Sequence, residues 1–212
     1  MLSRSAVLRR LLVTLPIAPL TVVAPPPARA LLGEVVSSGF TQSDDKSWDF
    51  TLPNPAWSVT AGNARAEHPK RIFHVMVSGP SGSGAELTVD PLKGARGLAD
   101  LGAVKEYGEK SLLSQQPPQS ELLGAEVVPG SVKGSKYYAI QYKLPAGVIK
   151  SYRITAKQGR VYSFAVSTPS SPSATLEADA QALLTSFKAF PVNIICITQS
   201  DSGTAPVPGS CY

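Results

Sequence analysis

The sequence predicts an α+β domain built on a mainly antiparallel sheet. Runs of alternating apolar and polar residues recur between residues 48 and 167, and clusters of Gly, Pro and Ser separate them. These runs follow one another as hairpins, which favours antiparallel over parallel pairing. Residues 174–187 have helical spacing instead. A chain of 212 residues buries enough surface to fold without a metal or a disulfide. We therefore expect one sheet covered by helices.

The first strands are expected on either side of a proline-rich break. Apolar side chains occupy every second position of Trp48–Leu52, and Pro53 ends that run. Trp57 follows as a large apolar anchor. Residues 70–79 and 85–92 alternate in the same way around the turn PSGSG, and together they predict a hairpin.

The rest of the domain is expected to consist of a helix, four strands and a second helix. The segment 98–114 has the apolar spacing of an amphipathic helix, which Gly102 and Gly108 weaken. Four alternating runs then predict strands at 122–128, 137–144, 150–156 and 160–167. Gln158-Gly159 is a turn signal between the last two. A helix is expected at 174–187, with Ser173 as its N-cap.

Residues 1–30 have the pattern of a cleavable targeting signal. The pair Arg9-Arg10 precedes a 14-residue run, Leu11 to Ala24, and Ala28 and Ala30 form an A-x-A cleavage site. A membrane-spanning helix needs about 20 apolar residues. Two prolines within the run argue against a buried core helix.

Two kinds of export signal fit these first residues. The arginine pair is typical of a twin-arginine signal, and a Sec-type signal fits nearly as well. The stretch before the pair carries no acid and is similar to a fragment of an organelle transit peptide, which leaves open whether the start is truncated.

The charge of the chain excludes an electrostatic nucleic-acid binder. The net charge of +5 comes from 20 basic and 15 acidic residues. Four of the arginines lie within residues 1–30, which contain no acid, so removal of the signal leaves 16 basic against 15 acidic residues. A body this close to neutral has no field that would attract a polyanion.

Three parts are expected after the signal. Residues 31–47 form a polar N-terminal arm, which is the leading docking candidate because a flexible segment can order on contact. Residues 48–190 form the domain, and 191–212 form a tail rich in Ser, Gly and Pro. Cys196 and Cys211 are the only cysteines of the chain. They form either a disulfide or two free thiols, and both alternatives stay open.

The residues give little support for an enzyme or a metal site. His68 and His74, with Glu67 and Asp90, match no known ligand spacing. Ser43–Asp45 could hold calcium only weakly, because no EF-hand register continues from it. The loop at 79–86 keeps the glycine spacing of a phosphate-binding loop but lacks its lysine, so we interpret it as a hairpin turn.

Several short motifs occur in an order typical of one known family. They are Phe50 and Pro53 with Trp57, then Gly134, Lys136, Tyr137 and Tyr138, then Gly159 and Tyr162, and finally Ser186 and Phe187. Through them the segment from about Ser47 to Phe190 resembles the PsbP domain of extrinsic thylakoid lumen proteins. The short segment after Trp57 and the tail depart from that pattern. No metal or docking residue of the family can be placed on this chain.

The resemblance implies a fold, a location and a role. The fold would be an α-β-α sandwich with a central, mainly antiparallel sheet. The protein would be a non-enzymatic, peripheral protein of the chloroplast thylakoid lumen, bound to lumenal subunits or assembly intermediates of photosystem II. It would help to retain calcium and chloride at the oxygen-evolving complex or assist photosystem assembly.

Two alternatives from other classes remain. The first is an exported binder of small molecules or lipids on the same fold, which predicts a deep apolar pocket between the sheet and a helix. The second is an exported hydrolase that uses Ser81 with a histidine as base. A filled core would favour the photosystem role over the binder.

Overall fold

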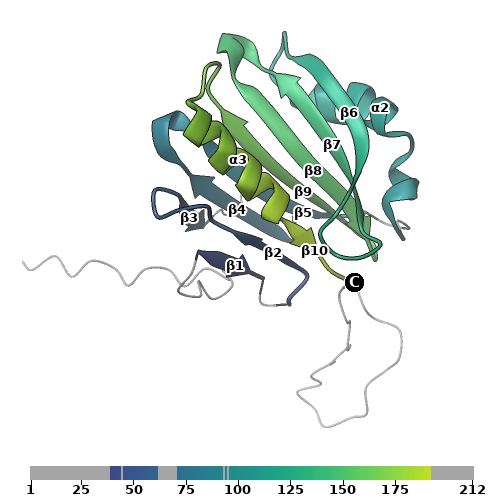
Figure 1. Cartoon of the computed structure of the whole chain (residues 1–212). Coiled ribbons are helices and arrows are strands. Elements are labelled where there is room, and N and C mark those ends of the chain that lie inside the picture. Colours follow the sequence, from purple (N-terminus) through teal and green to yellow (C-terminus); the bar gives the residue numbers. More distant parts are fainter. Residues whose placement is uncertain (1–38, 44, 62–70, 93, 95, 192–212) are drawn as a thin grey trace, which may run out of the picture.

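The computed structural model describes residues 39–43, 45–61, 71–92, 94 and 96–191 (Figure 1). Within them a seven-stranded antiparallel sheet has the strand order β3-β4-β5-β9-β8-β7-β6. Its strands are β3 (Ser58–Ala61), β4 (Phe73–Ser78), β5 (Gly84–Pro91), β6 (Glu121–Pro129), β7 (Lys136–Lys143), β8 (Ile149–Lys157) and β9 (Arg160–Thr168). A second sheet contains β1 (Phe40–Gln42), β2 (Trp48–Thr51) and β10 (Lys188–Ala189) in the order β1-β2-β10.

The expected hairpins form in the expected places. β4 and β5 pair around the short turn Pro80–Gly82. β8 and β9 pair around Gln158 and Gly159, whose φ angles of 48° and 75° are those of a two-residue hairpin turn. Gly159 occupies a left-handed conformation that glycine adopts without steric cost.

The two faces of the large sheet bury different cores, because successive side chains in a strand point to opposite faces. On one face, α3 (Ala174–Ser186) and the small sheet cover β5 and β9, and Figure 1 shows α3 lying across them. On the other face, the segment 98–116 covers β6, β7 and β8. Tyr137 belongs to the first core and its neighbour Tyr138 to the second. The expected α-β-α sandwich is confirmed.

Aromatic stacking fills the first core. The Phe50 ring stacks on Phe164 with centroids 5.1 Å apart, and Phe164 stacks on Phe187 at 5.0 Å. Leu183 of α3 closes this group, and all four side chains are fully buried. The helix begins where its cap was expected, since the Ser173 hydroxyl accepts from the Leu176 backbone N–H at 3.2 Å.

The helix expected at 98–114 is broken into short pieces. They are η2 (Leu98–Leu101), α2 (Val104–Glu106), a π-helical turn η3 (Tyr107–Leu112) and η4 (Leu113–Gln115). Gly102, with φ 86°, ends η2. The segment still buries its apolar side against the sheet, but three tyrosines from the strands replace a regular helical ladder as its anchors.

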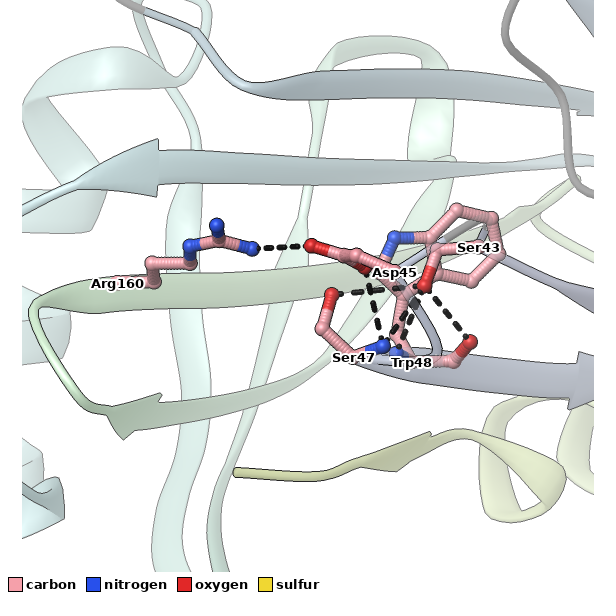
Figure 2. Close-up of polar contacts among 5 residues, drawn as sticks. All are labelled: Ser43, Asp45, Ser47, Trp48 and Arg160. Carbon is pink, nitrogen blue, oxygen red and sulfur yellow. Dashed lines mark hydrogen bonds and ion pairs between the residues drawn. The ribbon is translucent and has the colours of Figure 1, made fainter. Parts of the chain in front are cut away.

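The last part of the expected N-terminal arm, residues 31–47, packs as part of the domain. Phe40–Gln42 pairs with β2, so the described residues from 39 onwards belong to the folded domain. Figure 2 shows why the next turn is ordered. The Ser43 Oγ accepts from the Ser47 N–H at 2.9 Å, and the Asp45 carboxylate accepts from Arg160 Nη1 at 2.6 Å. These contacts attach the turn to the β8–β9 hairpin.

The elements that pack on the two faces of the large sheet cover different strands. Among the described residues, no helix covers the part over β6 and β7 on the α3 face or the part over β5 and β9 on the opposite face, and a cavity lies at each. No helix among the described residues is long and apolar enough to cross a membrane. The two open areas are therefore the places to look for a functional site.

Candidate functional site

A polar cluster lies on the face of the large sheet opposite α3. His74 of β4 and Glu86 of β5 sit on the same face of neighbouring strands, and His74 Nε2 lies 3.0 Å from Glu86 Oε1. Lys150 of β8 reaches the other carboxylate oxygen, with 3.6 Å between its Nζ and Glu86 Oε2. Glu86 thus joins a histidine and a lysine that are 76 positions apart in the sequence.

A second ion pair flanks this cluster. Arg71 Nε donates to Asp90 Oδ1 at 3.0 Å, and Asp90 belongs to the same face of β5 as Glu86. A cavity of about 180 Å³ opens beside the two pairs, between the strands and the end of the segment 98–116. Charged, amide and hydroxyl groups form most of its wall, so the cavity suits a polar ligand.

The lysine in this cluster keeps its charge. Burial by itself would lower the pKa of Lys150, but Tyr152 and the Glu86 carboxylate outweigh burial and raise that pKa above its ordinary value. The ammonium also lies 5.3 Å from the centroid of the Tyr152 ring, within the range of a cation–π contact. The site therefore presents a fixed positive charge.

The metal ligands sketched from the sequence do not come together. The contacts of His74 and Asp90 described above are with Glu86 and Arg71, and His68 and Glu67 lie outside the described residues. Asp45 of the Ser43–Asp45 motif is bound to Arg160 and to the Ser47 N–H. Calcium takes six to eight oxygen ligands. Among the described residues, no group of three or more His, Cys, Asp or Glu side chains could hold a metal ion.

The hydrolase alternative finds no support in the hairpin that carries Ser81 and His74. Ser81 lies in the turn, with φ 55°, whereas His74 lies four residues before the end of β4 at Ser78. At about 3.3 Å per residue, that separation places His74 about 13 Å from the strand end. Ser81 therefore has no base within hydrogen-bond reach in this hairpin.

The space between α3 and the sheet is filled rather than hollow. Phe164, Phe187 and Leu183 occupy it. Two cavities at its margin, of about 250 and 470 Å³, are each lined by polar and apolar side chains together rather than by apolar ones alone. The deep apolar pocket that a lipid binder requires is therefore not found among the described residues.

Most of the motif residues build the first core and its borders. Phe50, Tyr137, Tyr162 and Phe187 are fully buried together, and Trp57 packs against Gly79 beside them. A Cβ atom on Gly79 would lie 2.6 Å from the Trp57 ring, so only glycine fits there. These residues explain the fold and not the polar cluster.

The remaining motif residues lie in turns, at strand ends or at contacts between elements. Pro53 follows the end of β2, Gly134 adopts φ 78° before β7, and Lys136 is the exposed first residue of that strand. The Ser186 Oγ joins the end of α3 to β2, because it accepts from the Thr51 N–H at 2.9 Å. Tyr138 packs in the second core.

Several sequence predictions lie outside the described residues and stay predictions. They concern Arg9, Arg10, Ala28, Ala30, Cys196 and Cys211. Conversely, Glu86 and Lys150 were missed by the sequence reasoning. Their only signal was a charged residue at an alternating strand position, which is the ordinary pattern of a solvent-facing side chain.

Comparisons with known proteins identify the family. The model of the family described as PsbP matches residues 38–189. The solution structure of cyanobacterial PsbP (CyanoP) from Synechocystis sp. PCC 6803 superposes with a TM-score of 0.55 at 19% identity, covering 74% of this chain and 96% of that one.

A crystal structure from Bacteroides thetaiotaomicron gives a TM-score of 0.41 at 10% identity, covering 73% of this chain and 49% of that one. No curated protein matches this sequence. Because the family model spans both cores of the described domain, this chain belongs to the PsbP family.

Proposed function

We propose that this protein is an extrinsic protein of the thylakoid lumen that attaches to photosystem II. It supports the oxygen-evolving complex through calcium and chloride retention, or it assists photosystem assembly. The observation that carries the proposal is the PsbP family match across residues 38–189. The targeting pattern of residues 1–30 agrees with it.

The chemistry of this role is surface contact. Both cores are filled by their own side chains, so the described domain offers a rigid surface with a cavity on each face of the large sheet. A pre-organised surface loses little conformational entropy when it meets a partner. The part of the expected arm that precedes residue 39 stays the proposed docking segment.

Calcium enters this proposal through the partner. A docked domain can slow the loss of an ion from a neighbouring site without holding the ion itself. The described acidic residues agree with this role, because Asp45, Glu86 and Asp90 each pair with a basic side chain.

Fractionation of chloroplasts that express the tagged full chain tests the proposal. We expect the protein in the lumen, washed from thylakoids by salt, and co-purified with photosystem II subunits. Mass spectrometry should find a mature N-terminus near Leu31. A stromal location, retention of residues 1–30, or co-purification with photosystem I alone would contradict it.

A further inference from the structure

A groove lies beside α3 on the large sheet and ends at the edge strand β6. Gly124 of β6 and Ala139 of β7 line its sheet side, and their small side chains leave the surface hollow next to Leu184 of α3. Its volume is about 470 Å³, within the range of about 300–1,000 Å³ that is typical of ligand clefts. The cavity of about 250 Å³ shares Gln181 and Leu184 with it and extends it along the helix. The two together offer room for a short extended segment rather than for a single ion.

Arg153 of β8 brings a positive charge into the wall of this groove. Among the described residues, the only partner of its guanidinium is the ring of Tyr137, with 5.9 Å between Cζ and the ring centroid. Burial lowers the pKa of this guanidinium, and Tyr137 only partly offsets that effect. The five N–H donors are thus partly desolvated, so a carboxylate that enters the groove gains strong, charge-assisted hydrogen bonds from Arg153.

Tyr137 fixes the position of that charge. Its ring is fully buried against Phe187, with centroids 6.0 Å apart, and its hydroxyl accepts from the Ala189 N–H at 3.0 Å. The guanidinium therefore lies against a ring that the first core holds in place. A charge that is positioned before binding loses little conformational entropy when an acceptor arrives.

A negative charge lies across the groove from Arg153. The register pairs Glu126 of β6 with Ala139 and Ala139 with Arg153, so the three residues form one row on the same face of the sheet. Glu126 is exposed, and no basic side chain in the described part of the chain lies within ion-pair distance of it. Because adjacent strands are about 4.8 Å apart, the backbones of Glu126 and Arg153 are about 10 Å apart. Glu177 of α3 lines only the adjoining cavity.

These two charges match an extended peptide that carries both signs. In an extended chain, side chains two residues apart point to the same side and are about 7 Å apart. An acidic and a basic side chain at that spacing reach Arg153 and Glu126 when the segment crosses β7 over the small Ala139. The side-chain amides of Gln141 and Gln181 offer donors and acceptors to the backbone of such a segment.

We propose that this groove binds an extended segment of a partner protein in which an acidic and a basic residue are two positions apart. The acidic side chain accepts from the Arg153 guanidinium, and the basic side chain pairs with Glu126. This binding goes beyond the attachment to photosystem II, because it depends on the sequence of the segment and not on the assembly that carries it.

Titration of the isotope-labelled protein with capped peptides, followed by amide NMR, tests the groove. The peptide Ala-Glu-Ala-Lys-Ala should give saturable shifts at Glu126, Ala139 and Arg153, with a dissociation constant of about 1 mM for so short a segment. The peptide Ala-Gln-Ala-Lys-Ala lacks the carboxylate and should bind about 10-fold more weakly. The peptide Ala-Glu-Ala-Glu-Ala should also bind more weakly than the first, because its second acid meets Glu126.

Charge reversal at Glu126 separates recognition from folding. Glu126→Lys changes an exposed side chain, so the variant should unfold like the parent protein. It should prefer Ala-Glu-Ala-Glu-Ala over Ala-Glu-Ala-Lys-Ala several-fold, which reverses the preference of the parent. Glu121→Lys is the matched control, because it changes an exposed glutamate of the same strand that lines neither cavity, and it should keep the parent preference. Arg153→Gln should weaken binding of Ala-Glu-Ala-Lys-Ala about 10-fold.

Three results would overturn the proposal: no saturation by Ala-Glu-Ala-Lys-Ala, equal binding of Ala-Gln-Ala-Lys-Ala, or an unchanged preference in Glu126→Lys. Should Arg153→Gln fail to fold, Glu126→Lys decides alone, because its side chain is exposed. Saturable binding by a protein that does not associate with photosystem II would support the groove and contradict only the proposed function.

Discussion

Two aspartates four residues apart show how position decides the behaviour of a carboxylate. Burial would raise the pKa of Asp45, but hydrogen bonds from Ser47, Arg160 and Ser43 outweigh burial and lower that pKa below 3.8. In Asp49, desolvation raises the pKa above 3.8, and the attraction of Lys188, whose Nζ lies 3.8 Å from the carboxylate, only partly compensates. The ionised form of Asp45 therefore stabilises the fold, whereas the ionised form of Asp49 destabilises it.

The two aspartates predict opposite effects of the same substitution. At pH 7, Asp45→Asn should lower the free energy of unfolding by about 0.5–1.5 kcal/mol, since a partly exposed ion pair and its hydrogen bonds contribute about that much. Asp49→Asn should raise it by about 0.5–1 kcal/mol, because a buried charge with one distant partner is removed. Urea unfolding measures both.

The pH dependence follows from the directions of the pKa shifts. The contribution of Asp45 is present above the unfolded pKa, near 3.9, and disappears as pH falls through its lower folded pKa. The gain from Asp49→Asn should shrink as pH falls through the raised folded pKa, because the parent protein then takes up a proton. Glu109→Gln, at an exposed residue, serves as the control. Equal urea unfolding curves for the parent and Asp45→Asn proteins at pH 7 would refute the stabilising role of the Asp45–Arg160 pair.

The element that most depends on tertiary contacts is the segment 98–116. Its pieces are too short to be stable alone. Three strand tyrosines donate to it: Tyr138 to the carbonyls of Leu98 and Gly102, Tyr142 to the carbonyl of Gly108 at 2.7 Å, and Tyr152 to Gln116 Oε1 at 3.1 Å. The tyrosine hydroxyls thus add hydrogen bonds that tie this segment to the sheet, and the Gly108 carbonyl also accepts from the Leu113 N–H.

Removal of one buried hydroxyl tests this anchoring. Tyr142→Phe removes the buried hydrogen bond from the sheet to the Gly108 carbonyl, which keeps the Leu113 N–H as a donor, and should cost about 0.5–1.5 kcal/mol. Amide hydrogen exchange of residues 104–112 should accelerate at the same time. Tyr152→Phe is the matched control, because its acceptor is a side chain that can turn to solvent, and it should cost less. A greater loss for Tyr152→Phe than for Tyr142→Phe would contradict this account.

At the scale of the whole molecule, one sheet separates two cores and couples them. Neighbouring residues of β7, β8 and β9 point into different cores, so neither core can loosen without disturbing the same strands. We therefore expect both cores to unfold in a single transition.

Phe187 is the side chain with which to test this coupling. It is fully buried between Phe164 and Tyr137, just before β10 closes the small sheet. Phe187→Ala should lower the free energy of unfolding by about 3–5 kcal/mol. Tryptophan fluorescence reports the first core, and circular dichroism reports the sheet. The two curves should coincide in parent and variant, and separate midpoints would show that the cores are independent. Leu123→Ala, at an exposed residue, should change stability by less than about 0.5 kcal/mol.

The sequence by itself determined the elements of this protein that carry a clear local pattern. Strands β2 and β4–β9 and helix α3 were predictable, because side-chain alternation and helical spacing are properties of the local chain. Strands β1, β3 and β10 are two to four residues long, and no alternating apolar run marks them in the sequence, so they were not predicted. Gly102 signalled the break of the segment 98–116, but no local pattern signalled its π-helical turn, whose Gly108 carbonyl also accepts from the Tyr142 hydroxyl of a distant strand.

Only the tertiary structure decided the polar site. The site forms because β4, β5, β9 and β8 are consecutive neighbours in the sheet, which brings together His74, Glu86 and Lys150. The segment 98–116 ends beside this cluster and does not fill the cavity. Strand order is set by the burial of two cores at once, which no single stretch of sequence contains. Local physics therefore determined what each segment becomes, and packing determined which charged side chains share a cavity.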